Sequence, residues 1–467
     1  LDGGSNFLEL CSLAGLKMHD DKDGSGAGGG IIAGIGYVAG ARCMIQVNNS
    51  AIKGGTISPA GLDKTLRIQE IARANKLPII TLAESGGANL QYATDVFVPG
   101  AQAFANQARL SAAGIPQITV VHGNATAGGA YQPGLSDFII AVRNKTKMFL
   151  AGPPLLKAAT GEIATDEELG GAELHVYDAG TADYLAEDDA DGVRIAREVM
   201  AGLPWNDQVA PRPLSCAEKM YDEPLYSADE LLGIVPCDSK KPYDVREVVA
   251  RIADGSNFQD FKPDFDIQTV CGFIKIAGHA VGIIGNNGPI TAKGANKAAQ
   301  FIQLCDQKQV SLLFLHNTTG FMVGTDSEKS GIIKHGSKML QAVANARVPK
   351  ISIVIGGSYG AGNYAMCGKA YDPRLIVAWP SAKLAVMGGE QAANVLWTVK
   401  KDQLEARGES VTAEMEKDFK APILEKYEKE SSAYYATARL WDDGIIDPKE
   451  TRKVLALSLE TCLNAPM

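Results

Sequence analysis

Cysteine and histidine are sparse in this sequence, and neither is grouped as metal or redox chemistry requires. The 467 residues include eight cysteines, and the two closest, Cys216 and Cys237, are 21 positions apart. No Cys-x-x-Cys pattern exists, and none of the six histidines forms a His-x-x-x-His pair. Structural zinc sites and dithiol redox centres use such spacings. The sequence therefore predicts buried thiols in a reducing compartment and no metal site in this chain.

Long apolar runs and an excess of positive charge are also missing. The longest uncharged apolar stretch, residues 352–368, is interrupted by glycines, tyrosines and Asn363, which is unlike a membrane-spanning helix. Lys and Arg number 45 against 54 Asp and Glu, a net charge of -9. An acidic chain of this kind is a poor ligand for nucleic acid or an anionic membrane. We expect neither partner, so acidic groups of small molecules must be bound by local features.

The usual signatures of nucleophilic and nucleotide chemistry are absent too. Ser85 and Ser358 lack the Gly-x-Ser-x-Gly frame of a nucleophile elbow. There is no dinucleotide-binding fingerprint, no P-loop and no Ala-Met-Lys-Met motif for biotin attachment. Glu84 follows a predicted strand, and two roles stay open for it: a general base, or a cap on the following helix. His122 and His316, at strand ends, are interpreted as hydrogen-bonded structural histidines.

Glycine, in contrast, is abundant, and much of it falls in an internal repeat. It accounts for 50 of the 467 residues, against about 7% in average proteins. Three segments of the first half align without gaps with the second half: residues 34–49 with 272–287 at an offset of 238, and residues 77–87 with 310–320 and 115–129 with 348–362 at an offset of 233. The sequence therefore predicts two duplicated modules.

Each module alternates short β-rich apolar runs with longer helical patterns. Residues 79–82 and 117–121 are predicted strands, and the apolar positions of residues 61–75 recur at helical spacing. This alternation predicts α/β modules with a mainly buried sheet. Six of the 21 prolines fall between the modules, as in an interdomain connection. We expect three regions: an N-terminal domain over residues 1–204, a linker over 205–242 and a C-terminal domain over 243–467.

A strand, a glycine loop and a helix are predicted in succession twice in each module. The four loops have related sequences: ESGGA at 84–88, TAGGA at 126–130, NTTGF at 317–321 and YGAGN at 359–363. Glycine lets neighbouring backbone N–H groups turn toward one ligand atom, and a helix start adds partial positive charge. Two such loops can direct two N–H donors at an oxygen that becomes negative in the transition state. The duplication therefore predicts two oxyanion holes, one for each of two reacting partners.

Eight motifs spread along the whole chain resemble those of one protein family. They are KGGT at 53–56, SGGA at 85–88, TAGGAY at 126–131, FLAGPPLLKAATGE at 149–162, TGFMVG at 319–324, GGSYGAGNYAMCG at 356–368, WPSAKLAVMGGEQAANVL at 379–396 and ARLWDDGIIDP at 438–448. The family is the carboxyltransferase β subunits of biotin-dependent acyl-CoA carboxylases, and the wording is most similar to the methylcrotonoyl-CoA and geranyl-CoA carboxylase branch. The resemblance implies an α/β fold of two duplicated crotonase-like (ClpP/crotonase) ββα-superhelix domains, the first on the acyl-CoA side and the second on the biotin side.

The resemblance also implies a reaction and a set of site residues. Carboxybiotin releases CO2, and the resulting biotin enolate takes the acidic proton of the acyl-CoA, so the protein supplies no base. By position, Gly128 and Gly129 match the hole for the thioester oxygen, and Ala361 and Gly362 match the hole for the biotin ureido oxygen. The expected substrate-binding residues are Lys53, Gly54, Gly86, Gly87, Ala88, Thr319, Gly320, Phe321 and Tyr359.

The partners follow from the same resemblance. Biotin is expected on a separate α subunit that carries the biotin carboxylase and the biotin carrier, and it is not attached to this chain. The chain is expected to form a homo-oligomer, the β6 core of an α6β6 assembly. The implied location is the cytoplasm of a bacterium or the mitochondrial matrix of a eukaryote. Relatives have further residues before the point that corresponds to Leu1, so we expect a leading segment.

Alternatives remain for the substrate and for the function. The favoured substrate is 3-methylcrotonoyl-CoA, with geranyl-CoA, propionyl-CoA or another acyl-CoA as alternatives, because Asn89, Gln91, Gln132 and Gly134 depart from the relatives' pattern. A crotonase-fold hydratase or isomerase would need acidic bases beside a single hole. A non-catalytic assembly scaffold would not need an intact pair of glycine loops in both modules. Sodium-linked decarboxylation of glutaconyl-CoA uses the same active-site logic in reverse.

Overall fold

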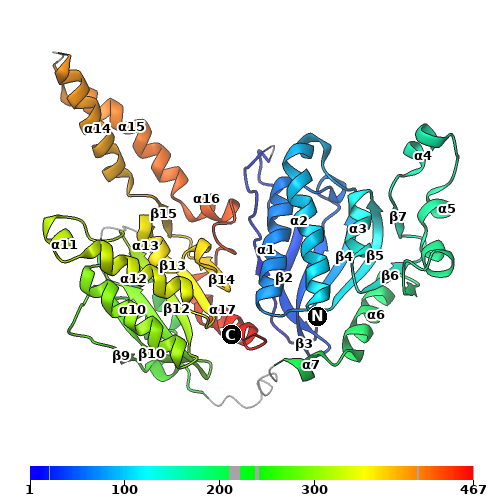
Figure 1. Cartoon of the computed structure of the whole chain (residues 1–467), viewed down its shortest axis with the longest axis horizontal. Helices are drawn as coiled ribbons and strands as arrows, with labels where there is room; N and C mark the ends of the chain where they lie inside the picture. The colour runs from blue at the N-terminus through cyan, green and yellow to red at the C-terminus, as the bar shows by residue number, and fades with distance from the viewer. Residues whose placement is uncertain (20, 210–220, 237–240, 408–409, 466–467) are drawn as a thin grey trace. The chain divides into compact units, whose positions relative to one another are not determined.

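The computed structural model describes residues 1–19, 21–209, 221–236, 241–407 and 410–465, and the chain divides into two compact units (Figure 1). Unit 1 comprises residues 1–213, 438–440 and 460–465, and unit 2 comprises residues 214–437, 441–459 and 466–467. Residues 210–220 and 237–240 of the expected linker lie outside the described residues. The rest of it includes two short helices, α7 (Trp205–Gln208) and α8 (Leu231–Ile234).

Unit 1 is built on a sheet with the strand order β1-β2-β3-β4-β5-β6-β8, and β7 also pairs with β5. The first three strands are antiparallel: β1 (Leu8–Leu10), β2 (Ile31–Val38) and β3 (Ala41–Asn48). The others extend the sheet in parallel: β4 (Ile79–Ser85), β5 (Gln117–Thr126), β6 (Phe138–Val142), β7 (Lys147–Phe149) and β8 (Tyr184–Ala186). Parallel strands end at one edge of a sheet, so the loops after β4 and β5 are neighbours.

The helices of unit 1 cover the sheet and flank those loops (Figure 1). They are α1 (Pro59–Ala74), α2 (Ala93–Ala112), α3 (Gly128–Gly134), α4 (Pro153–Thr160), α5 (Asp166–Gly170) and α6 (Asp189–Gly202). Helix α1 begins where the Ser58 side chain accepts a hydrogen bond from the Gly61 amide, with proline at its first position. Its apolar side chains Leu62, Ile68 and Ile71 are buried, as the predicted helical spacing requires.

Unit 2 repeats this arrangement. Its sheet has the order β14-β13-β12-β11-β10-β9, with β15 also paired to β13. The strands are β9 (Gln259–Asp260), β10 (Thr269–Ile276), β11 (His279–Asn286), β12 (Ser311–Thr318), β13 (Lys350–Tyr359), β14 (Leu375–Ala378) and β15 (Lys383–Ala385). The pairing is antiparallel as far as β11 and parallel beyond it.

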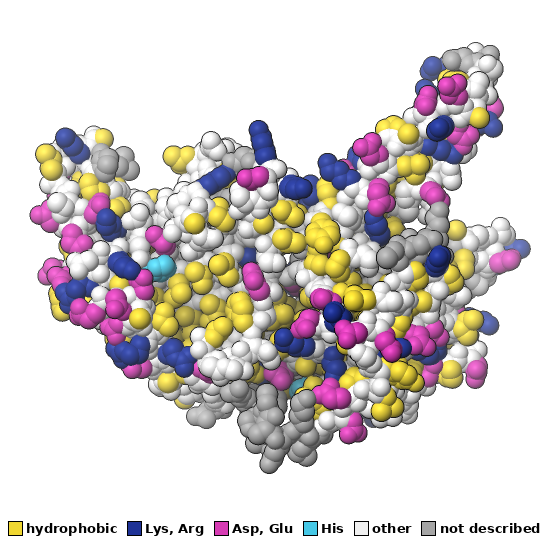
Figure 2. All heavy atoms as spheres, turned by 180° about the vertical axis from the view of Figure 1, so that it is seen from behind, with side chains coloured by type: hydrophobic (Ala, Val, Ile, Leu, Met, Phe, Trp, Pro, Cys, Tyr) yellow, Lys and Arg dark blue, Asp and Glu magenta, His cyan; other side chains and the backbone are white. Residues whose placement is uncertain are grey.

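The helices of unit 2 are α9 (Val245–Val249), α10 (Ala292–Gln307), α11 (Thr325–Lys329), α12 (Ile332–Asn345), α13 (Gly360–Ala365), α14 (Gly389–Ala406), α15 (Ala413–Glu430), α16 (Ala433–Ala438) and α17 (Thr451–Cys462). Helices α14 and α15 pair with one another and project from unit 2 (Figure 1). Figure 2 shows acidic and basic side chains interspersed over the visible face, without a large area of one sign.

The duplication predicted from the sequence is confirmed in detail. Both units contain an antiparallel hairpin followed by a buried helix and two parallel strands. Each first helix also buries a lysine at the same position of the repeat. Lys64 of α1 donates to the Ile31 carbonyl at 2.6 Å, and Lys297 of α10 donates to the Asp266 carbonyl at 3.0 Å. The α/β fold with two parallel-dominated sheets is therefore the fold that the repeat predicted.

The described thiols are buried and unreactive. The side chains of Cys11, Cys43, Cys271, Cys305, Cys367 and Cys462 are buried, whereas Cys216 and Cys237 lie outside the described residues. Burial raises the pKa of Cys305 and of Cys367 to about 12. Within the described part of the chain no group of three or more His, Cys, Asp or Glu could hold a metal ion. No helix in that part is both long enough and apolar enough to cross a bilayer.

Candidate active sites

In unit 1 the chain turns sharply after β5, at Ala127. This residue has φ 52° and ψ -120°, a conformation that residues with a Cβ rarely adopt. Helix α3 begins directly afterwards, so the amides of Gly128 and Gly129 have no acceptor within the helix. Both glycines line a cavity, and a Cβ on Gly129 would lie 3.1 Å from Ser85 Oγ. The strained turn therefore places two glycines, whose amides have no acceptor within the helix, in the wall of the cavity.

The loop after β4 supports this turn from the neighbouring strand. The Gly87 amide donates to Ser85 Oγ at 3.2 Å, and the Gly87 carbonyl accepts from the Ile57 amide at 2.8 Å. Residues 53–56 pack against the same loop, because a Cβ on Gly55 would lie 2.3 Å from the Glu84 carbonyl. A Cβ on Gly86 would lie 3.2 Å from the Gly54 carbonyl. The structure thus brings together the predicted segments at 53–54 and 86–88.

The cavity beside Gly128 and Gly129 has a volume of about 430 Å³. It lies among β3, β4, β5 and the helices α1, α2 and α3. Most of its wall is apolar, with side chains that include Ile57, Leu62, Val96, Ala103 and Phe104. No charged residue lines it among the described residues. An apolar cavity with two N–H donors at one end suits an acyl chain whose carbonyl oxygen is held at the donors.

Unit 2 contains the same device after β13. Gly360, with φ 54°, occupies the position of Ala127, and α13 begins there. Gly320 donates to Thr318 Oγ1 at 3.2 Å and accepts from the Ile290 amide at 2.9 Å, as Gly87 does in unit 1. A Cβ on Gly362 would lie 2.8 Å from the Gly320 Cα. Gly362 is therefore packed closely against the Thr318–Gly320 loop, and Ala361 precedes it in the first turn of α13.

A buried hydrogen-bond network links β12, β13 and α13 beside the glycine turn of unit 2. His316 Nδ1 and Ser358 Oγ are 2.9 Å apart, and Asn363 Nδ2 donates to the same hydroxyl at 2.9 Å. Burial lowers the pKa of His316 to about 3, so the imidazole is neutral at physiological pH. The structural interpretation of His316 is confirmed. His122 differs, because its Nε2 is buried with no hydrogen-bond partner in the described part of the chain.

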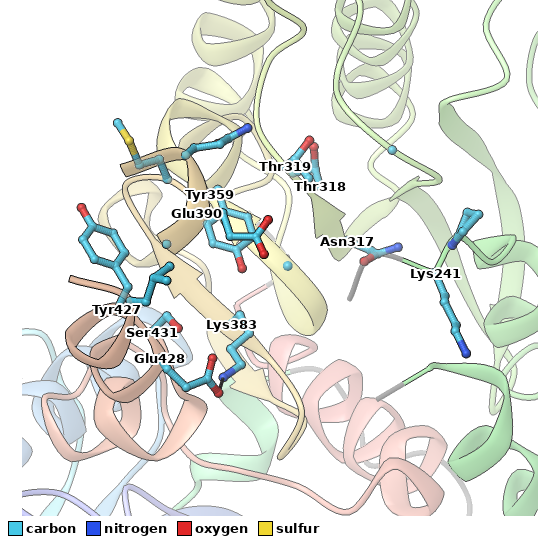
Figure 3. Close-up of a pocket in the computed structure, with 18 of the residues that line it drawn as sticks. Lys241, Asn317, Thr318, Thr319, Tyr359, Lys383, Glu390, Tyr427, Glu428 and Ser431 are labelled. Carbon is cyan, nitrogen blue, oxygen red and sulfur yellow. Dashed lines mark hydrogen bonds and ion pairs between the residues drawn. The ribbon is translucent and has the colours of Figure 1, made fainter. Parts of the chain in front are cut away.

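A second pocket, of about 750 Å³, lies at the end of β12 and β13 in unit 2 (Figure 3). Its wall mixes apolar and polar groups, and the polar ones include Asn317, Thr318, Thr319 and Tyr359 from the strand ends and loops. Helices α14 and α15 and strand β15 add charged and aromatic groups: Lys383, Glu390, Tyr427 and Glu428. Lys383 and Glu428 form an ion pair there. Burial and the charge of Glu428 raise the pKa of Tyr359, which keeps its hydroxyl protonated.

The predicted residues divide into those that line the two pockets and those that support them. Ala88, Gly128 and Gly129 line the cavity of unit 1, and Thr319 and Tyr359 line the pocket of unit 2. The others are not part of either lining: Lys53, Gly54, Gly86, Gly87, Gly320, Phe321, Ala361 and Gly362. The glycines among them bring the loops close together, so glycine is needed there for backbone packing.

Two details expected of the loops are wrong. Only the second loop of each unit opens directly into a helix, because α2 begins at Ala93 and α11 at Thr325, several residues after the first loops. Glu84 does not cap α2, whose N-terminus has no side-chain cap. Its side chain lies over Gly123, where a Cβ would be 2.5 Å from Glu84 Cγ. The polypeptide between loop and helix makes room for the acyl cavity instead.

The sequence interpretation also missed the polar residues of the cavity. Gln46, Thr81, Gln107 and Gln117 line it. The available signal was a glutamine inside each of two apolar strand sequences, CMIQVN at 43–48 and QITVV at 117–121. Of the residues expected to reshape the acyl pocket, Gln132 lines the cavity, whereas Asn89, Gln91 and Gly134 do not.

Two duplicated α/β modules, each with a glycine turn that leads into a helix beside a pocket, define the class of the protein as a two-module α/β enzyme. The family model described as "Carboxyl transferase domain" matches residues 1–467. The chain belongs to the carboxyl transferase family, and it is a carboxyltransferase subunit of the biotin-dependent acyl-CoA carboxylase class. The resemblance noted from the motifs is confirmed, and so is the crotonase-like fold.

Three relatives illustrate the similarity. The crystal structure of the β subunit of geranyl-CoA carboxylase from P. aeruginosa is 62% identical, with a TM-score of 0.92, and the match covers 100% of this chain and 85% of that chain. The mitochondrial methylcrotonoyl-CoA carboxylase β chain of Dictyostelium discoideum is 50% identical over 100% of this chain and 79% of its own length. The biotin-dependent 3-methylcrotonyl-coenzyme A carboxylase β1 subunit of Mycobacterium tuberculosis is 50% identical over 100% of this chain and 87% of its own length.

Proposed function

We propose that this chain transfers a carboxyl group from carboxybiotin, carried by a partner subunit, to a branched α,β-unsaturated acyl-CoA. The observation that carries the proposal is the pairing of two equivalent glycine turns with two unlike pockets. The apolar cavity at Gly128 and Gly129 fits an acyl chain, and the pocket at Thr319 and Tyr359, which also contains charged groups, fits a ureido ring. Bound carboxybiotin supplies the CO2 and a ring nitrogen that accepts the substrate proton.

The residues of the chain then have defined roles. The Gly128 and Gly129 amides donate to the thioester oxygen as it becomes an enolate oxygen, and the Ala361 and Gly362 amides donate to the ureido oxygen. Loss of one such donor typically costs about 2.7 to 4 kcal/mol of transition-state stabilisation. Ala88 leaves space for the acyl chain, and the loops at 53–54 and 86–87 hold the backbone of the first hole. No side chain needs to act as a base.

For the acyl group, we propose geranyl-CoA, with 3-methylcrotonoyl-CoA as the second candidate. The cavity continues along α2, where Gly100 lines it and a Cβ on Gly100 would meet nothing within 4 Å. A cavity this long suits a chain of geranyl length. The 62% identity to a geranyl-CoA carboxylase β subunit supports the same substrate. The 50% identity to methylcrotonoyl-CoA carboxylase β chains supports the second candidate.

The test is bicarbonate fixation by the chain assembled with its biotinylated partner, measured with geranyl-, 3-methylcrotonoyl- and propionyl-CoA. We expect the largest kcat/KM for geranyl-CoA. The variant Gly100→Leu narrows the cavity and should lower kcat/KM for geranyl-CoA more than for 3-methylcrotonoyl-CoA. Ala108→Leu, on the same helix but outside the cavity lining, is the matched control. Turnover of none of the three thioesters by a correctly assembled enzyme would refute the proposal.

We further propose the assembly and location that the family resemblance implies. The chain forms a β6 core, on which α subunits with biotin carboxylase and carrier functions complete an α6β6 enzyme. It works in the cytoplasm of a bacterium or the matrix of a mitochondrion. Sedimentation velocity of the purified chain, alone and with its partner, tests the assembly. A monomer at micromolar concentration would contradict it.

A further inference from the structure

The inner end of the unit 1 cavity is polar, although most of its wall is apolar. We call this end the polar floor and define it as Gln46, Thr81, Gln107 and Gln117. All four residues line the cavity, and each is between 3% and 7% exposed. They come from three neighbouring strands and from α2: Gln46 and Thr81 are paired in register between β3 and β4, and Gln117 on β5 is paired with Ile79. The floor is thus set in rigid elements of the sheet.

The polar floor has hydrogen-bonding capacity that the chain itself does not use. Gln117 Nε2 donates to the Gln107 carbonyl at 2.8 Å, and Gln107 Nε2 donates to the Gln132 carbonyl at 3.0 Å. These bonds use both Nε2 groups, and neither Oε1 atom accepts a hydrogen bond among the described residues. Gln46 and Thr81 make no side-chain hydrogen bond within the described residues. Buried polar groups of this kind destabilise the protein unless a partner satisfies them.

The distance along the sheet indicates which part of a substrate would reach the floor. Ser85 packs against Gly129 at the oxyanion hole, and Thr81 lies four residues before it on β4, about 13 Å away at roughly 3.3 Å per residue. An extended eight-carbon acyl chain spans about 9 Å, given C–C bonds of about 1.5 Å, whereas a four-carbon chain spans only about 4 Å. With one hydrogen bond of about 3 Å at its end, the longer chain reaches Thr81.

The charge and hydrogen-bonding pattern define the group that fits there. No charged residue lines the cavity among the described residues, so an ionised carboxylate at the chain end would be desolvated without a counter-charge. The floor offers acceptors at Gln107 and Gln117 and both donor and acceptor capacity at Gln46 and Thr81. A hydroxyl group donates and accepts, and is uncharged.

We propose that the cavity binds acyl-CoA thioesters that carry a hydroxyl group at the far end of a chain of geranyl length, and that the polar floor selects them. This inference rests on the proposed function, since it extends the acyl substrate of the same site. The substrate would arise from an enzyme that hydroxylates the terminal methyl of an isoprenoid acid or alcohol before its thioester is carboxylated. The carboxylation chemistry at the oxyanion hole is unchanged.

Titration calorimetry on the full-length chain tests the proposal without the partner subunit. The probes are geranyl-CoA and 8-hydroxygeranyl-CoA. We expect the hydroxylated thioester to bind about tenfold more tightly, the effect of one to two hydrogen bonds to a buried site. Thr81→Val keeps the shape of the side chain and removes its hydroxyl, and Gln46→Met does the same for an amide. Each should abolish most of the preference while binding geranyl-CoA at least as tightly.

Thr94→Val, an exposed position on α2 outside the cavity lining, controls for the substitution itself and should retain the full preference. Equal affinity for the two thioesters in the unaltered chain overturns the inference, because water would then satisfy the floor. A preference that survives both Thr81→Val and Gln46→Met also overturns it. Failure of a folded chain to bind either thioester refutes the proposed function, and this inference with it.

Discussion

The two units share one backbone device and differ in what lies beside it. In unit 1 the residue after the first glycine loop is Ala88, and Ala103 of α2 faces the same cavity. At the same repeat offset, unit 2 has Phe321 and Gly336, and a Cβ on Gly336 would lie 3.0 Å from the Phe321 ring. The phenylalanine occupies the space that unit 1 leaves open. The duplicated frame therefore fixes the donors, and single side chains decide whether an acyl cavity exists.

The linings of the two pockets also differ in the charged residues that they contain. Neutral and mostly apolar groups surround the cavity of unit 1. Lys383, Glu390 and Glu428 contribute charge to the pocket of unit 2, and two of them come from the α14–α15 pair. The proposed function assigns the acyl chain to the first of these environments and the ureido ring to the second. On that assignment, the two copies of the module serve two chemically unlike substrates.

The largest effect is expected from blocking either hole. Gly129→Val and Gly362→Val should each lower kcat by about 100-fold to 1,000-fold, the loss typical of one oxyanion-hole donor. The Gly362 change also displaces the Gly320 backbone, because its Cβ has only 2.8 Å of space. Carboxyl transfer is the measured activity. Circular dichroism is the control that shows whether each variant is folded. Gly134→Ala, on α3 with open space around its Cβ, should leave turnover unchanged. Near-normal turnover in either folded valine variant would refute the two-hole mechanism.

Ala88→Phe should fill the cavity of unit 1 with a ring, as Phe321 fills the corresponding space in unit 2. We expect kcat/KM for acyl-CoA to fall by about 100-fold, since the ring removes the space for the acyl chain. Decarboxylation of free carboxybiotin, which the proposed function assigns to unit 2, should be unaffected. A matched Ala88→Ser variant should retain most activity. If the phenylalanine variant processed geranyl-CoA normally, the acyl chain would have to bind elsewhere.

Phe321→Ala tests the same packing difference in unit 2, through its effect on the free energy of unfolding. The ring packs on the buried core of unit 2, and its loss should lower the free energy of unfolding by about 2 to 3 kcal/mol, below the range for a fully buried phenylalanine. Urea unfolding followed by fluorescence measures the change. Ala88→Gly, the corresponding truncation in unit 1, should cost less than 1 kcal/mol because the side chain borders a cavity. Equal costs at the two positions would contradict the packing difference.

The pH dependence of stability should depend on Asp442 of unit 2. Burial raises the pKa of this carboxyl from 3.8 to about 7. The folded state then binds a proton more tightly than the unfolded state, so the stabilising contribution is complete below about pH 4 and is lost as the pH rises to about 7. The melting temperature of the unaltered chain should fall between pH 5 and pH 8 by more than that of Asp442→Asn. Parallel pH profiles for the two proteins would contradict this assignment.

The smallest effect is expected at the turn itself. Ala127 and Gly360 adopt the same positive φ, which costs a residue with a Cβ about 1 kcal/mol or more. Ala127→Gly should therefore stabilise the protein by about 0.5 kcal/mol, after the entropy cost of glycine in the unfolded chain. Gly360→Ala should destabilise it, because its Cβ would also lie 2.9 Å from the Val386 carbonyl. Thermal unfolding of both variants gives the signs, and two shifts of the same sign would be inconsistent with a shared strained turn.

The sequence was sufficient for the parts of this account that depend on local pattern. The offsets of the repeat identified both sheets, and the spacing of Leu62, Ile68 and Ile71 identified α1. The glycine positions identified the turns at 128–129 and 361–362, since close backbone approach is a constraint that only glycine meets at most such places. These are short-range properties, which a single sequence records directly.

The pockets could not be predicted in the same way. Gln46, Thr81 and Gln117 meet only because β3, β4 and β5 pair in a particular register, and nothing near each residue in the sequence specifies its cross-strand neighbour. The first glycine loop of unit 1 does not lead directly into α2. This feature likewise depends on the path of residues 89–92 between the loop and the helix. Phe321, an expected substrate-binding residue, packs its ring against the buried core of unit 2, a contact that its neighbours in the sequence do not specify.

The central claim is a division of labour, in which unit 1 binds the acyl thioester and unit 2 binds the carboxyl donor. It is tested most directly by measuring the affinity of geranyl-CoA and of free biotin for the chain and for its Gly129→Val and Gly362→Val variants by titration calorimetry. The account predicts that Gly129→Val loses affinity for the thioester and retains affinity for biotin, while Gly362→Val shows the opposite pattern. If both variants lost the same ligand, or if Gly129→Val bound the thioester with unchanged affinity, the division of labour would be contradicted.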